Sequence, residues 1–179
     1  MKKTLFVALF LCVPPAFAKF TVASKAIPGK SKIKMEQVFN GFGCTGQNVS
    51  PDLEWKGAPK ETRAFAVTMY DPDAQAGNGW WHWLVFNIPA SVTKLEAGAG
   101  DVKAGKLDPA AIQSRTDFNS YGYGGPCPPA GHKPHRYFIR VYALKEPLAL
   151  DKDSPAATVG FNVNANKLAV AELLGTFGR

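Results

Sequence analysis

The chain of 179 residues lacks a long hydrophobic run. Its longest apolar stretch, residues 5–13, falls short of the roughly 20 residues that a membrane-spanning helix needs. A protein anchored by spanning helices is therefore excluded. The stretch follows Lys2 and Lys3 and precedes Ala16-Phe17-Ala18, a pattern typical of signal-peptide cleavage sites. We predict a signal peptide at residues 1–18, a single domain at residues 19–179, and a soluble periplasmic or secreted protein.

Cysteine is scarce, and Cys12 lies within the predicted signal peptide, which leaves Cys44 and Cys127. In an oxidising compartment two cysteines most simply form a disulfide, so neither serves as a nucleophile or a metal ligand. A Gly-x-Ser-x-Gly elbow is missing, and prolines interrupt the spacing of His132 and His135. The sequence therefore favours a protein that is not an enzyme and that uses no metal and no cofactor.

Acidic residues are outnumbered, with 14 Asp and Glu against 21 Lys and Arg and a formal net charge of +7. The basic residues are scattered, whereas nucleic-acid binders more often show a dense basic stripe with aromatic residues between. The charge thus indicates a mildly cationic, solvated surface, and we predict no nucleic-acid partner.

The mature chain contains several short segments typical of β-strands. Residues 20–23 and 62–70 alternate apolar and polar side chains, and residues 81–88 and 136–144 are rich in aromatic and branched residues. Only residues 164–177 show helical spacing of leucine and alanine. Loops rich in glycine and proline occupy residues 40–59, 71–79 and 119–134, where binding groups often lie. We predict a mostly β protein, a sandwich of antiparallel sheets with a few peripheral helices, including one at the C-terminus.

Two groups of residues at predicted strand ends have a chemical character. Asp71 follows a strand and precedes a rigid Pro turn, so it either faces a cleft or forms an Asx-turn with its own backbone. Alternation along the next strand places Trp81 and Trp83 on one face and His82 on the other, with Leu84. His82 is then either a core histidine with a satisfied hydrogen bond or a residue at the open end of that face.

A third group is the loop of residues 121–131, which leads into His132, His135, Arg136 and Tyr137. Its glycines permit close approach of the backbone to a ligand, and successive N–H groups can form an anion-binding nest. The alternative is a rigid loop held by Cys127. Along the strand that follows, Arg136 should face away from its two neighbours.

Together these groups resemble the phosphatidylethanolamine-binding protein family, and within it the exported, disulfide-bearing branch of the bacterial Raf kinase inhibitor-like proteins. The residues that carry the resemblance are Gly43-Cys44, Asn48-Val49-Ser50-Pro51, Leu53-x-Trp55, Asp71-Pro72-Asp73-Ala74, Trp81-His82-Trp83, Asp117-Phe118, Tyr123-Gly-Gly-Pro126-Cys127-Pro-Pro129, His135-Arg136-Tyr137 and residues 171–179. Gln75, in place of a common proline, and Ser114-Arg115-Thr116 depart from the family pattern.

The resemblance implies a β-sandwich with a small pocket at one end that takes phosphate, acetate or a phosphoryl head group. The implied ligand-binding residues are Asp71, His82, Tyr123, Pro128, His135 and Tyr137. We expect His82, protonated or as a neutral donor, the Tyr137 hydroxyl and loop N–H groups to donate to the anion, and Asp71 to orient His82. The function implied is binding of a small anion in a ligand-binding or modulatory protein. The alternative is a protein–protein inhibitor of a protease or kinase pathway, in which the pocket is secondary and the partner is unknown.

Overall fold

The computed structural model describes residues 19–179, so the predicted signal peptide lies outside the described residues. Its largest element is a six-stranded sheet in the order β2-β11-β10-β6-β7-β9. The strands of this sheet are β2 (Ser31–Lys32), β6 (Ala64–Asp71), β7 (Trp80–Pro89), β9 (Ile112–Gln113), β10 (His135–Leu144) and β11 (Lys167–Phe177). Neighbouring strands pair antiparallel except β2 and β11, which are parallel.

A smaller sheet covers one face of the large sheet. It has the order β1-β5-β8, formed by β1 (Thr21–Ala23), β5 (Leu53–Lys56) and β8 (Lys94–Leu95). Trp55 from β5 is buried in one cluster with Val67, Met69 and Ile139 of the large sheet. The mostly β sandwich that the sequence predicts is therefore confirmed.

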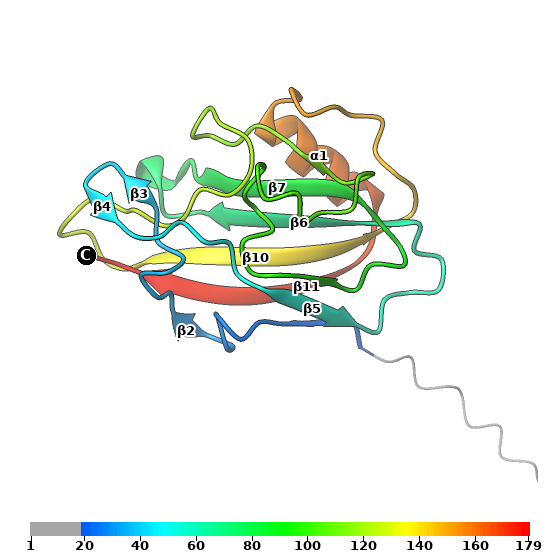
Figure 1. The fold of residues 1–179 in the computed structure, drawn as a ribbon, viewed down its shortest axis with the longest axis horizontal. Helices are drawn as coiled ribbons and strands as arrows, with labels where there is room; N and C mark the ends of the chain where they lie inside the picture. Colours follow the sequence, from blue (N-terminus) through cyan, green and yellow to red (C-terminus); the bar gives the residue numbers. More distant parts are fainter. Residues whose placement is uncertain (1–18) are drawn as a thin grey trace, which may run out of the picture.

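The other face of the large sheet packs against a helix, α1 (Ala156–Asn166), which lies beside β7 in Figure 1. Val159 and Val163 of α1 are buried with Leu84 and Phe86 of β7. Gly160 makes this approach possible, because a Cβ there would lie 2.5 Å from a ring carbon of Trp81. No helix within residues 19–179 is long and apolar enough to span a bilayer.

The predicted helix near the C-terminus is present as α1, but its predicted bounds, residues 164–177, are wrong, because α1 ends at Asn166 and the chain continues as β11. β11 pairs with β10 along nearly its whole length. Ala171, Leu173 and Phe177 are buried at intervals of two and four residues, which is the period of a strand. Leucine and alanine have high helix propensity, but here sheet pairing and burial override it.

Two further short elements lie near the end of the sheet at which β10 begins. β3 (Asn40–Gly41) and β4 (Cys44–Thr45) form a hairpin. A 3-10 turn, η1 (Gln75–Gly77), connects β6 to β7. Figure 1 shows the hairpin and this turn at the same end of the molecule as the C-terminus.

Candidate ligand-binding site

A cleft of about 390 Å³ opens at this end of the large sheet. β6 ends there with Asp71, and its antiparallel neighbours β7 and β10 begin there with Trp80 and His135. Antiparallel pairing thus brings three segments that are far apart in the chain to one edge of the sheet. A larger cleft of about 530 Å³ lies between residues 99–113 and 150–152, and it contains none of the predicted site residues.

Asp71 and His135 form a buried pair at the floor of the cleft. The Nδ1 atom of His135 lies 2.8 Å from Oδ2 of Asp71, and both side chains are nearly inaccessible. The other carboxylate oxygen accepts the backbone N–H of Asp73 at 2.8 Å. Both interpretations of Asp71 therefore hold, since it forms a local Asx-type bond and faces the cleft.

Tyr137 follows His135 at the next inward position of β10 and lines the same cleft. Its side chain is fully buried, yet its hydroxyl has no hydrogen-bond partner. Burial, the charge of Asp71 and the approach of the hydroxyl to that carboxylate raise the pKa of Tyr137 far above the ordinary value, so the hydroxyl stays protonated. Leaving such a group without a partner costs about 1–3 kcal/mol. This hydroxyl is a buried hydrogen-bond donor at the cleft, close to the Asp71 carboxylate.

His82 reaches the cleft through a β-bulge that alternation does not predict. Tyr70 pairs with Trp81 and Met69 pairs with Trp83, so His82 is the extra residue of β7. Trp81 consequently packs on the α1 side of the sheet, whereas the ring of His82 meets that of Tyr137 at 5.2 Å. The predicted placement of His82 on the face of Leu84 is wrong, because a bulge shifts the alternation by one residue.

The hydrogen bonding of His82 also differs from the prediction of a protonated donor. Its Nδ1 lies 2.7 Å from the carbonyl oxygen of Gly124, so Nδ1 carries the hydrogen and donates it there. Burial lowers the pKa of His82 to about 4, so the imidazole is neutral near pH 7. The other ring nitrogen, Nε2, is then an acceptor with a lone pair.

Gly124 and Gly125 of the glycine-rich loop do not contribute N–H groups to the expected anion-binding nest. The N–H of Gly124 donates to the carbonyl of His82 at 2.8 Å, and that of Gly125 donates to the Asn48 side chain at 2.8 Å. A Cβ at Gly125 would lie 2.1 Å from the carbonyl oxygen of Gln37. These glycines are therefore needed for close packing inside the protein, and their N–H groups are already used.

Tyr123, in the same loop, does not line the cleft. Its ring packs edge-on against Trp83, and its hydroxyl donates to the Gln37 carbonyl at 2.9 Å. The structure brings the other five predicted ligand-binding residues together: Asp71, His82, Pro128, His135 and Tyr137. Their role with a ligand stays a prediction.

Several residues that line the cleft were not among the predicted ligand-binding residues. Trp80 lines the cleft, and its buried indole N–H is a second donor without a hydrogen-bond partner. Phe118 stacks edge-on against both Trp80 and His82 and forms an apolar wall. Phe42, 70% exposed, lies at the rim, and His132 approaches Nε2 of His135 to 3.4 Å. The sequence places Trp80, Trp81 and Trp83 close together, and it does not indicate which of the three indoles lines the cleft.

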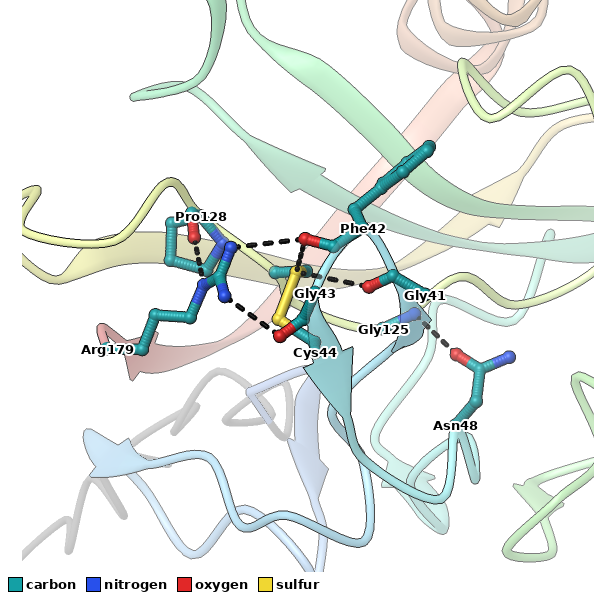
Figure 2. Close-up of a disulfide and its surroundings, with 9 residues drawn as sticks. Gly41, Phe42, Gly43, Cys44, Asn48, Gly125, Pro128 and Arg179 are labelled. Carbon is teal, nitrogen blue, oxygen red and sulfur yellow. Dashed lines mark hydrogen bonds between the residues drawn. A yellow bond between two sulfur atoms is a disulfide. The ribbon is translucent and has the colours of Figure 1, made fainter.

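The predicted disulfide between Cys44 and Cys127 is present, with the two Cα atoms 6.0 Å apart. Arg179 reinforces the same junction, as Figure 2 shows. Its guanidinium donates to the carbonyls of Phe42, Gly43 and Pro128 at distances between 2.8 and 3.2 Å. A covalent bond and an arginine together hold the turn after β3 against the proline segment of the cleft wall.

The two departures from the family pattern have different positions. Gln75 lines the cleft, and both Gln75 and Ala76 have positive φ, 46° and 55°, which side chains rarely adopt. Residues 114–116 lie outside the cleft lining. Arg136 faces away from the cleft, as predicted, and forms an ion pair with Asp73 at 2.7 Å. That ion pair lowers the pKa of Asp73.

Comparison with known proteins identifies the fold and the family. UPF0098 protein YbcL of Escherichia coli K12 is 49% identical, with 96% of each chain covered. UPF0098 protein YbhB of the same organism is 44% identical over 82% of this chain and 92% of its own. The crystal structure of E. coli YbcL, described as a member of the mammalian PEBP family, superposes with a TM-score of 0.87, covering 90% of this chain and 99% of that one. Residues 25–178 match the family model described as phosphatidylethanolamine-binding protein, and the chain belongs to that family.

Proposed function

We propose that this protein binds a small anion, a phosphoryl group or a carboxylate, in the cleft at the end of β6, β7 and β10. The observation that carries the proposal is the Tyr137 hydroxyl, which is fully buried and has no partner within residues 19–179. A buried donor without an acceptor is destabilising, and an anionic oxygen is the strongest acceptor that can relieve it. The Trp80 indole N–H offers a second donor in the same cleft.

The Asp71–His135 pair moderates the charge of this site. Nδ1 of His135 donates to the Asp71 carboxylate at 2.8 Å, and this hydrogen bond partly offsets the negative charge of Asp71. The apolar residues Phe118, Phe42 and Pro129 line the cleft, so water competes weakly for its donors. A few-atom anion makes few contacts, and we expect binding in about the millimolar range.

The proposal is one of binding without turnover, in an exported protein. The cleft lining contains one cysteine, Cys127, whose sulfur is held in the disulfide. The lining includes no serine, threonine or lysine that could act as a nucleophile. A disulfide persists in oxidising compartments, which supports export alongside the signal-like pattern of residues 1–18. Incubation with a chromogenic phosphomonoester tests the absence of turnover, and release of the chromophore above the background rate would contradict it.

A titration with inorganic phosphate, followed by amide NMR, tests the binding proposal. We expect shifts at the end of β6 and at the starts of β7 and β10. The larger cleft supplies a matched control, because it contains Lys106 and Lys152, which could attract phosphate without specificity. Lys106→Gln should leave the shifts and the affinity unchanged. Shifts confined to the larger cleft, or their loss in Lys106→Gln, would overturn the proposal.

A further inference from the structure

β11 has an open edge along much of its length. On one side it pairs with β10 over nearly all its residues, whereas on the other side β2 pairs only with Gly175 and Thr176 (Figure 1). The N–H of Ile33 donates to the carbonyl of Thr176 at 2.8 Å, so the backbone groups of Thr176 point away from β10. Backbone groups alternate in direction along a strand, and those of Val170 and Glu172 therefore point the same way. No strand of the described chain pairs with them on that side.

Two common devices that block an exposed sheet edge are missing from this stretch. Natural edge strands often carry lysine or proline, which prevent another chain from pairing with them. Residues 168–174 contain neither, and their one charged side chain, Glu172, forms an ion pair with Arg140 at 2.6 Å. Val170 is 44% exposed. The edge therefore presents free N–H and C=O groups beside apolar side chains, which is the arrangement that accepts an added strand.

A pocket of about 300 Å³ adjoins the open edge, next to the start of β2. Its lining includes Phe138 and Leu174, which lie at paired positions of β10 and β11, and Gly29 and Lys30, which lead into β2. When a strand is added to a sheet, main-chain hydrogen bonds give affinity and pockets for alternate side chains give specificity. This pocket is placed to receive one apolar side chain of a strand that lies beside Val170.

The unpaired charges around the edge are basic. Lys30 lines the pocket, Lys32 lies on β2, and Lys167 is the first residue of β11. None of the three forms an ion pair within the described residues, whereas Glu172 is already paired with Arg140. Lys30 and Lys167 lie at opposite ends of the open stretch. A segment with an acidic residue at each end therefore complements the charge of the edge.

We propose that the open edge of β11 binds an extended segment of a protein partner as an added strand. An apolar side chain of the segment enters the pocket of Phe138 and Leu174, and its acidic ends lie near the lysines. The site is separate from the anion cleft, because Val170 pairs with Tyr142, toward the end of β10 that lies away from His135. The proposal is therefore independent of the anion-binding function proposed above.

A capped peptide, Asp-Thr-Leu-Thr-Val-Thr-Asp, tests the proposal on the whole protein, with amide hydrogen exchange followed by NMR. Its apolar side chains fall on one face when it is extended. We expect the amides of Val170 and Glu172 to exchange rapidly in the free protein and to become protected at about 1 mM peptide. Two further peptides carry methyl groups on alternate backbone nitrogens, in the two possible phases. Only the phase whose methyl groups face β11 should lose binding.

Two pairs of matched variants examine the edge and its charge. Val170→Pro removes an outward N–H that β10 does not use, whereas Val170→Thr keeps it, so only the proline variant should lose binding of the peptide. Lys30→Gln should weaken binding by about two- to fivefold. Lys103→Gln removes an exposed lysine beside the larger cleft and should leave the affinity unchanged.

The amide spectrum of β6 and β7 shows whether the Val170→Pro protein is folded, and the methylated peptides decide on the unmodified protein if it is not. Absence of protection at about 1 mM peptide would overturn the proposal. Binding that persists in a folded Val170→Pro protein, or equal binding of the two methylated peptides, would overturn it as well. Self-association that protects Val170 and Glu172 without any peptide would assign the edge to a second copy of this chain, and the proposal of a separate partner would then be wrong.

Discussion

Replacing Tyr137 with phenylalanine should make the protein more stable and its ligand binding weaker. The hydroxyl is fully buried and has no partner, so it contributes an unmet desolvation cost to the folded state. Tyr137→Phe removes that cost, and we expect the free energy of unfolding to rise by about 1–3 kcal/mol. For a domain of this size each kcal/mol raises the melting temperature by about 2–4 °C. The same change deletes a hydrogen bond to a charged ligand, worth about 1.5–3 kcal/mol, or about 10- to 150-fold in phosphate affinity.

Tyr123→Phe is the matched control, because Tyr123 is also a buried tyrosine but its hydroxyl donates to the Gln37 carbonyl. Its removal leaves that carbonyl without a partner, so we expect a loss of about 1 kcal/mol and no direct loss of phosphate affinity. Urea denaturation of the free proteins gives the change in stability of each variant, and phosphate titration gives the change in affinity of each. A destabilised Tyr137→Phe protein, or one with unchanged phosphate affinity, would refute the reasoning.

Three further predictions concern the surroundings of the cleft. Burial lowers the pKa of His82 from 6.5 to about 4, so the unfolded chain binds a proton at a higher pH than the folded protein does. About 3 kcal/mol of the free energy of unfolding should therefore be lost as pH falls from about 6.5 to 4. Urea denaturation should show a smaller loss over this pH range in His82→Gln, and an equal loss in both proteins would contradict the prediction. Reducing the disulfide should lower the free energy of unfolding by at most about 4–5 kcal/mol. Arg179→Gln should lower it by at least about 0.5 kcal/mol more in the reduced protein than in the oxidised one, because both interactions hold the same junction. Additive losses would show that the disulfide and Arg179 act independently. Gly160→Ala should lower the melting temperature despite the better helix propensity of alanine, because its Cβ would meet Trp81, and a raised melting temperature would contradict that packing.

The convergence of Asp71, His135 and Tyr137 was implied by the family resemblance, and their positions at strand ends explain it. Asp71 closes one strand and His135 opens another, and antiparallel neighbours place such ends at the same sheet edge. The central strands were predicted to within two residues at each end, since aromatic and branched residues dominate them. Residues 167–177 misled the prediction because leucine and alanine spaced three and four apart fit a helix, whereas the pairing with β10 is a long-range contact that no local pattern records.

The chemistry of the cleft depends on one feature that alternation conceals. The bulge in β7 turns His82 from the face that packs on α1 to the face of Tyr137, and it sets Nδ1 against the Gly124 carbonyl. Counting residues by two from Trp81 gives the wrong face, because a bulge adds one residue without any mark in the amino-acid types. The tautomer follows from this placement, and with it the change of His82 from the expected donor to an acceptor. The only ring hydrogen of the neutral His82 is used by the Gly124 carbonyl, so Nε2 is an acceptor nitrogen near the Asp71 carboxylate.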